Sequence, residues 1–132
     1  MAKCVLMIED DEEMLFLGKI ILDKGGYTAL SATNGLDGLA LLAENKDNIS
    51  LILLDIMLPG MYGWEILKQI KDDESVKHIP VIMLTSIHYL DDQGQAEEYA
   101  DLYSDYVVKP FVVRDLLDKI AAGIQRAEQA QD

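Results

Sequence analysis

The chain has 132 residues, a length that suits one domain, and half of its residues are hydrophobic, which argues against disorder. Its net charge of −13 disfavours direct binding to nucleic acid or to anionic membranes, because both would need clustered Lys and Arg. The single cysteine, Cys4, excludes an internal disulfide, and no apolar run of about 18 residues could cross a bilayer, so we expect a cytoplasmic protein.

Short apolar runs alternate with helical patterns along the chain. The apolar runs are rich in Val, Ile and Leu and predict strands at residues 3–8, 27–32, 49–55, 79–85 and 105–109. Apolar residues at helical spacing between and after them predict helices in the segments 11–26, 34–47, 63–74, 89–103 and 111–129. Asn34 is expected to cap the second helix, and Pro80 stands near the start of the fourth strand, where proline is tolerated.

This alternation predicts a single α/β domain over residues 1–125, followed by a polar tail at 126–132. Five βα units imply a parallel sheet with helices on both faces, which is a three-layer, doubly wound arrangement. In such sheets, ligands bind beyond the carboxyl ends of the strands. The residues that follow each strand are therefore the first candidates for a functional site.

Polar residues follow several predicted strands. Glu9 and Asp10 follow the first strand, Asp55 ends the third, Thr85 ends the fourth and Lys109 ends the fifth. Each has an ordinary explanation alone, since acids suit a helix N-terminus, threonine caps helices and lysine is common in loops. Their shared position at one edge of the sheet instead predicts a site that binds a cation, although the net charge alone is also explained by solubility.

The residue types predict phosphoryl chemistry at this edge. Clustered carboxylates repel one another, and Mg²⁺, which prefers oxygen ligands, removes that conflict. Lys109 offers a positive charge and Thr85 a hydroxyl donor for phosphoryl oxygens. Asp55 is then placed to act as a nucleophile that forms an aspartyl phosphate.

Four segments in order resemble the response regulator receiver domains (the CheY-like superfamily) of bacterial two-component signalling. They are "VLMIEDDEE", "LLDIMLPGMYGWEIL", "PVIMLTS" and "DYVVKPF", and the similarity covers roughly residues 3–125. The resemblance implies a (βα)5 flavodoxin-like fold with strand order 2-1-3-4-5.

The resemblance also implies a role for each matching residue. Asp55 would accept a phosphoryl group from a phosphohistidine on a sensor kinase or phosphotransfer protein. Asp10, the Asp55 carboxylate and the Met57 carbonyl would bind Mg²⁺, the one implied cofactor, and Glu9 would act through a metal-bound water. These residues together form the expected metal site.

The remaining matching residues would respond to phosphorylation. Thr85 would turn toward the phosphoryl group and Lys109 would pair with it, while Tyr106 would turn inward as the switch aromatic. The Lys109–Pro110 bond is expected to be cis. A face built from the fourth predicted helix, the fifth strand and the fifth helix would then bind a downstream protein partner.

The favoured function is a phosphoacceptor in a His-Asp phosphorelay that is not an enzyme beyond slow autodephosphorylation. Because no DNA-binding domain follows residue 125, we expect output through protein contacts, unless the sequence is part of a longer protein. The resemblance leaves open whether phosphorylation drives homodimer formation.

The alternative function is a Mg²⁺-dependent phosphohydrolase with an Asp nucleophile, but such enzymes usually carry a second Asp two residues later, where this chain has Met57. A binding module that works without phosphorylation is a third option, and the complete acid, Thr and Lys set argues against it.

Some residues fall outside the expected site. His78 and His88 are predicted to be surface residues, and Trp64 is predicted to be core. Ile87, Tyr89 and Leu90 either pack the fourth helix or extend the partner face. The family often has a small-residue pair before the fifth strand, where this chain has Leu102-Tyr103, so we expect a different local geometry there.

Overall fold

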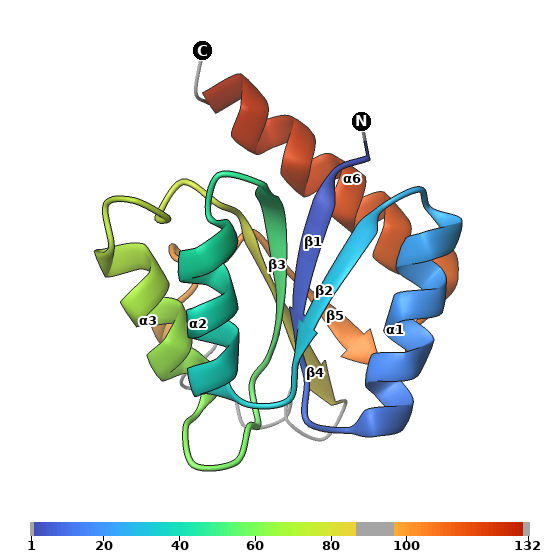
Figure 1. Cartoon of the computed structure of the whole chain (residues 1–132), viewed down its shortest axis with the longest axis horizontal. Coiled ribbons are helices and arrows are strands. Elements are labelled where there is room, and N and C mark those ends of the chain that lie inside the picture. Colours follow the sequence, from blue (N-terminus) through green and yellow to red (C-terminus); the bar gives the residue numbers. More distant parts are fainter. Residues whose placement is uncertain (1, 87–96, 131–132) are drawn as a thin grey trace.

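The computed structural model describes residues 2–86 and 97–130 and contains one five-stranded parallel sheet in the order β2-β1-β3-β4-β5. This is the predicted α/β fold with the predicted strand order (Figure 1). The strands are β1 (Cys4–Ile8), β2 (Thr28–Ala32), β3 (Ile49–Asp55), β4 (Val81–Ser86) and β5 (Asp105–Lys109). The helices with described bounds are α1 (Glu12–Lys24), α2 (Gly35–Asn45), α3 (Gly63–Asp72) and α6 (Val113–Ala130).

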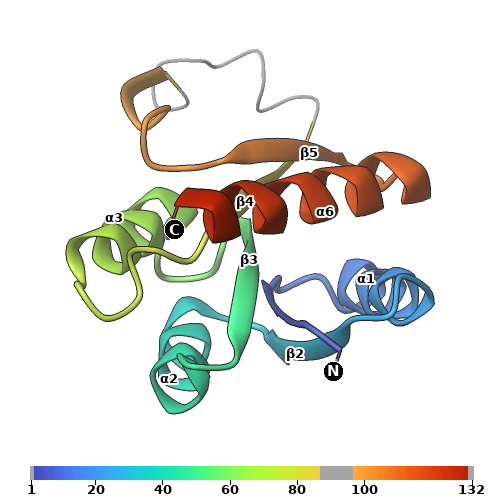
Figure 2. The same cartoon turned by 90° about the horizontal axis from the view of Figure 1, so that it is seen from above.

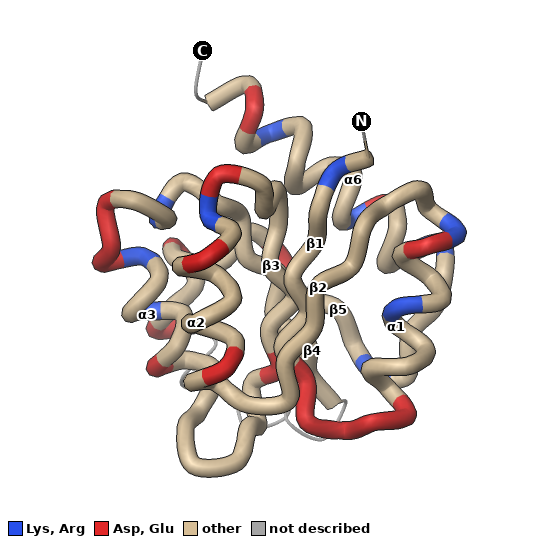
Figure 3. The backbone as a smooth tube through the Cα atoms, in the orientation of Figure 1, with Lys and Arg blue, Asp and Glu red and all other residues tan. Residues whose placement is uncertain are grey.

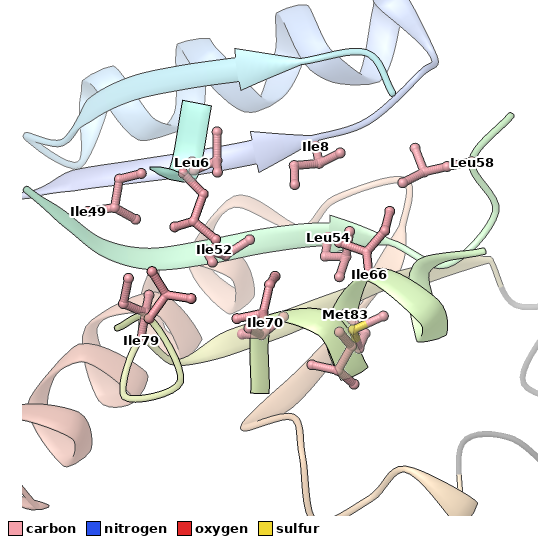
Figure 4. Close-up of a cluster of buried hydrophobic side chains, with 14 of the residues drawn as sticks. Leu6, Ile8, Ile49, Ile52, Leu54, Leu58, Ile66, Ile70, Ile79 and Met83 are labelled. Atoms are coloured by element: carbon pink, nitrogen blue, oxygen red, sulfur yellow. The ribbon is translucent and has the colours of Figure 1, made fainter. Parts of the chain in front are cut away.

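The helices cover the sheet in two layers, with α2 and α3 on one face and α1 and α6 on the other (Figures 1 and 2). The central strands are buried on both faces, which explains why β3 reads as a continuous apolar run. Alternate residues of β3 enter opposite clusters: Ile52 and Leu54 pack toward α2 and α3 (Figure 4), whereas Leu51 and Leu53 pack toward α1 and α6. The sheet is therefore held between two cores, and its strand ends are fixed on a rigid frame.

The bounds of the elements agree closely with the sequence prediction where helical or strand periodicity is strong. The strands at 49–55 and 105–109 have the predicted ends, and the Asn34 side chain caps α2 by accepting a hydrogen bond from the Asp37 N–H at 2.8 Å. The fourth strand begins at Val81 rather than at residue 79, because the Pro80 nitrogen has no hydrogen to donate to the sheet. The Pro80 carbonyl still accepts a hydrogen bond from the Ile52 N–H.

The C-terminal half departs from the predicted helices in the segment before β5, whereas the closing helix ends within one residue of its predicted end at 129. In the predicted helix at 89–103, residues 89–96 lie outside the described part, Glu97 and Glu98 are helical, and residues 99–102 form a turn, so the prediction of a helix through Tyr103 is wrong. At the C-terminus, α6 continues to Ala130, and Lys3 pairs with Glu128 on its last turns. Residues 126–130 of the expected polar tail therefore extend the helix.

Aromatic packing explains the turn before β5. The Trp64 ring on α3 stacks on Tyr99 with ring centroids 5.3 Å apart and lies against Tyr103 at 5.7 Å. Leu102 packs on the same core cluster, and Trp64 itself is buried, as predicted. Large side chains thus occupy the positions where the resemblance led us to expect a small-residue pair. Their packing holds this turn against α3.

Three other expectations from the sequence concern the surface and the membrane. His78 is exposed, as predicted, whereas His88, Ile87, Tyr89 and Leu90 lie outside the described residues. None of the helices in the described part of the chain has the length and hydropathy that crossing a lipid bilayer requires.

Candidate functional site

Acidic side chains meet at the carboxyl edge of the sheet. Carboxylate oxygens of Glu9, Asp10 and Asp55 all lie within 4.8 Å of one another, although β1 and β3 are far apart in sequence. The pairing of Ile8 with Leu54 in the parallel register brings the two strand ends level. Figure 3 shows the acidic run after β1 at this end of the molecule. The sequence prediction that these three residues form one cluster is confirmed.

Lys109 closes the cluster from the end of β5. Its Nζ lies 2.7 Å from Glu9 Oε1 and 3.2 Å from Asp55 Oδ2. Glu9 and Asp55 are buried, and the Lys109 side chain is 18% exposed. One ammonium therefore balances two buried carboxylates, while Asp10 adds a third acid on the exposed side.

Burial and the neighbouring charges raise the pKa values of Glu9 and Lys109. Burial, reinforced by the neighbouring Asp55 carboxyl, raises the pKa of Glu9 to about 7 despite its bond from Lys109. Burial acts to lower the pKa of Lys109, but its hydrogen bond to Glu9 and the Asp55 charge outweigh burial and raise it. Near neutral pH, the carboxylates of this cluster therefore carry more negative charge than the single Lys109 ammonium can balance.

This imbalance of charge predicts a pH dependence of folding stability. The pKa of Glu9 is higher in the folded state, about 7, than its ordinary value of 4.5, so the folded state binds the extra proton between these values. The contribution of Glu9 to the unfolding free energy has its full value below about pH 4.5 and is lost as the pH rises toward 7. We compare the unfolding free energies of wild type and Glu9→Gln in metal-free buffer. Between pH 4.5 and 7, the value for wild type should fall by on the order of 2–3 kcal/mol relative to that of the variant. Parallel urea titrations of both proteins measure the difference, and a constant difference from pH 4.5 to 8 contradicts the assignment.

Backbone contacts fix the Asp55 side chain. Its Oδ1 accepts a hydrogen bond from the Met57 N–H at 3.1 Å, and the chain then turns through Gly60, whose φ of +75° favours glycine. Gly63 returns to donate its N–H to the Ile56 carbonyl at 2.7 Å. A Cβ on Gly63 would lie 2.3 Å from the Asp55 carbonyl oxygen, so only glycine fits there.

Gly63→Ala is expected to destabilise the fold by about 3 kcal/mol, because backbone atoms on both sides would have to separate. Thermal or urea unfolding measures the loss. The matched control is Gly123→Ala on α6, where the nearest atom is a flexible Leu51 methyl at 3.1 Å. That variant should remain within about 1 kcal/mol of wild type, since alanine also favours the helix. Equal effects at the two positions would contradict the proposed close approach.

Of the other predicted site residues, Thr85 and Met57 line the same cavity, which has a volume of about 260 Å³, and Tyr106 does not. Thr85 is buried and donates its hydroxyl to the Ser86 carbonyl at 3.2 Å, and Met57 lines the cavity with its side chain exposed. The Lys109–Pro110 bond is cis, as predicted. Tyr106 lies on β5 with its side chain exposed, outside the residues that line the cavity.

The donor set of the cavity fits a hard divalent cation. Three carboxylates offer oxygen ligands against one lysine, and burial of Glu9 makes added positive charge favourable. The residues that could hold Mg²⁺ are those predicted, namely Glu9, Asp10, Asp55 and the carbonyl of Met57.

Sequence reasoning missed Lys119 on α6. Its Nζ donates to the Tyr106 carbonyl at 2.8 Å and lies 5.5 Å above the Tyr106 ring, where a cation–π contact is favourable. The same ammonium lies 3.5 Å from Asp115 and 3.9 Å from Asp105. The spacing from Asp115 to Lys119 signals a helical pair, but nothing in the local sequence points to Tyr106 as a partner.

The sequence matches one family, described as Response regulator receiver domain, over residues 5–121. It is 34% identical over 126 residues to the DNA-binding dual master transcriptional regulator RpaA of Synechocystis sp., with 95% of this chain and 50% of RpaA covered. It is 33% identical over 120 residues to the polar-differentiation response regulator DivK of Brucella anthropi, with 91% of this chain and 94% of DivK covered. The chain spans about half the length of the transcriptional regulators that it matches.

Solved structures show the same arrangement. A response regulator receiver domain protein from Clostridium thermocellum has a TM-score of 0.85 and 29% identity, with 97% of this chain and 98% of that chain covered. A CheY-like receiver domain protein from Methanospirillum hungatei has a TM-score of 0.83 and 29% identity, with 98% and 99% covered.

Proposed function

Because this chain belongs to the response regulator receiver domain family, we propose that it is a phosphoacceptor switch whose Asp55 takes up a phosphoryl group in a Mg²⁺-dependent reaction. The observation that carries the proposal is the position of Asp55. Its carboxylate is almost fully buried at the end of a rigid strand, beside two further acids and 3.2 Å from Lys109. An acid in this place needs a chemical reason, since burying charge is costly.

The reaction is a transfer from a phosphohistidine of a sensor kinase or phosphotransfer protein. An Asp55 oxygen forms a bond to phosphorus as the P–N bond breaks, and the bonding electron pair stays on the imidazole nitrogen. Asp10, Asp55 and the Met57 carbonyl, with Glu9 beside them, would hold Mg²⁺, which when bound supplies positive charge that neutralises phosphoryl oxygens.

The remaining residues stabilise the product. Lys109 exchanges its contact with Asp55 Oδ2 for one with the phosphoryl oxygens, keeping its ammonium paired throughout. Thr85, whose hydroxyl donates to the Ser86 carbonyl at 3.2 Å, turns that hydroxyl toward the phosphoryl group. In both cases the hydrogen-bond acceptor changes from a protein oxygen to an oxygen of the more highly charged phosphoryl group.

Tyr106 carries the change to the surface. Its side chain is 42% exposed and lies beneath Lys119, so β5 and α6 share a polar and aromatic face that can rearrange. A downstream protein partner would bind this face, together with the segment at 89–103 that is only partly described. Exposed apolar side chains offer contacts to the phosphodonor protein, and one of them, Met57, lines the site; the others are Phe16, Tyr62, Val112 and Val113.

The test is incubation of the whole chain with Mg²⁺ and a small phosphodonor such as acetyl phosphate. We expect the mass of one phosphoryl group per chain by intact-mass spectrometry, and a change in Trp64 fluorescence because α3 follows the Asp55 loop directly. A protein that stays unmodified over a range of donor and Mg²⁺ concentrations contradicts the proposal. Steady turnover of a phosphomonoester that depends on Asp55 would instead favour the phosphohydrolase.

A further inference from the structure

A second polar cavity lies at the amino edge of the sheet, the edge that Figure 2 faces. It has a volume of about 270 Å³ and lies between the end of α3, the turn before β5, the start of β4 and α6. Lys71, His78 and Arg126 line it, with Asp101 as the one acid among its lining residues. A neighbouring cavity of similar size shares His78, and its charged lining residues are Lys46, Asp47 and Glu128.

The two cationic side chains of this cavity, Lys71 and Arg126, and the neighbouring His78 lack carboxylate partners within the described ranges. No Asp or Glu oxygen there comes within 4.0 Å of Lys71 Nζ, His78 or Arg126. Lys68, one turn earlier on the exposed side of α3, instead pairs with Asp72 at 3.4 Å. Uncompensated positive charge in a chain of net charge −13 is unexpected, since acids outnumber bases 24 to 11.

Lys71 is held in place by the backbone. Its Nζ donates to the Lys77 carbonyl at 3.0 Å and to the Ile79 carbonyl at 2.7 Å, which leaves one N–H of the ammonium for another acceptor. Its side chain is half-buried, and this burial lowers the pKa of Lys71 to about 8. A bound anion would supply the missing acceptor and relieve the cost of this half-buried charge.

We propose that the cavity formed by Lys71, His78 and Arg126 binds the phosphate group of a small molecule. A lysine point charge and a planar guanidinium that line one cavity suit a tetrahedral oxyanion with several acceptor oxygens. The cavity is small and open to solvent, which suits the exposed phosphate group of a small ligand, whereas the acidic surface repels extended polyanions such as nucleic acid.

This site is separate from the phosphoacceptor site. Pro80 lines the amino-edge cavity and Thr85 lines the acidic one, so about 16 Å of strand β4 separates them, at about 3.3 Å per residue. The lining of the amino-edge cavity includes no member of the acidic cluster. Binding should therefore require neither Mg²⁺ nor Asp55.

The experiment titrates inorganic pyrophosphate, and adenosine monophosphate in parallel, into the whole chain in metal-free buffer, followed by calorimetry and by NMR of the Lys71 side chain. We expect saturable binding at one site, a rise in the pKa of Lys71 and unchanged affinity in Asp55→Asn. Stronger binding of the nucleotide would assign the neighbouring cavity to the organic part of the ligand.

Variants distinguish the site from general charge attraction. Lys71→Met and Arg126→Gln should each weaken binding by about tenfold or more, since each removes a charged hydrogen bond. The matched control, Lys68→Met, removes the same charge from the exposed side of α3 and should bind as wild type does. Arg126 is exposed and has no hydrogen-bond partner within residues 2–86 and 97–130, so its replacement tests binding even if Lys71→Met fails to fold.

Absence of saturable binding overturns the proposal, as does an equal loss of affinity in Lys68→Met and Arg126→Gln. Neither result bears on Asp55 phosphorylation, which is followed separately by intact mass.

Discussion

Asp55→Asn is expected to abolish phosphoryl uptake from a small phosphodonor while the protein stays folded. The amide keeps the shape of the side chain and can still accept the Met57 N–H, but it lacks the nucleophilic carboxylate oxygens. Removing one of two buried carboxylates also reduces repulsion with Glu9, so the pKa of Glu9 should move down toward its ordinary range. Intact-mass spectrometry after incubation with Mg²⁺ and acetyl phosphate measures the loss directly.

The control is Asp118→Asn, which removes an exposed acid from α6 and should be phosphorylated as wild type is. If Asp55→Asn still gains a phosphoryl group under conditions that modify wild type, another residue is the acceptor. Peptide mapping would then identify that residue, and the role given to Asp55 would be wrong.

Lys109→Met is expected to lower the metal-free unfolding free energy at pH 8 by about 3 kcal/mol. The change leaves Glu9 and Asp55 buried without their only ammonium partner in the described structure, and breaking a buried pair on one side typically costs about 3–5 kcal/mol. We use the lower end of this range because the Lys109 side chain is 18% exposed. The same substitution should slow phosphorylation, since the product loses its lysine partner.

Mg²⁺ separates this electrostatic effect from lost packing. If the variant is unstable because the acids lack positive charge, Mg²⁺ should stabilise Lys109→Met more than it stabilises wild type. Urea titrations with and without Mg²⁺ measure both values, with Lys68→Met, an exposed pair worth at most about 1 kcal/mol, as the control. A Lys109→Met protein as stable as that control, with no added response to Mg²⁺, would show that the ion pairs do not stabilise the fold.

Local sequence was enough to predict most elements, because each has its own periodicity. The apolar run at 49–55 and the strand at 105–109 need no distant partner to be recognised, and Asn34 signals the start of its helix by residue type alone. Five alternating units imply a parallel sheet, and its carboxyl edge gathers Glu9, Asp10 and Asp55 whatever the details of packing.

Prediction from local sequence fails where contacts between distant segments determine the local structure. The turn at 99–102 replaces the predicted end of a helix because Tyr99 and Tyr103 pack on Trp64, a contact between distant segments that outweighs local helical preference. The positions of Lys119 over Tyr106 and of Lys71 beneath two backbone carbonyls likewise depend on how a helix packs on its neighbours.

The amino-acid sequence by itself therefore determined the fold class and the residue types at the acidic edge, since both follow from patterns a few residues long. Only the tertiary structure decided which charges balance one another. Lys109 pairs with Glu9 across 100 residues of chain, whereas Arg126 and Lys71 line one cavity and have no carboxylate within 4.0 Å in the described structure. Electrostatic energies depend on distance and burial, and neither quantity exists until the chain has folded.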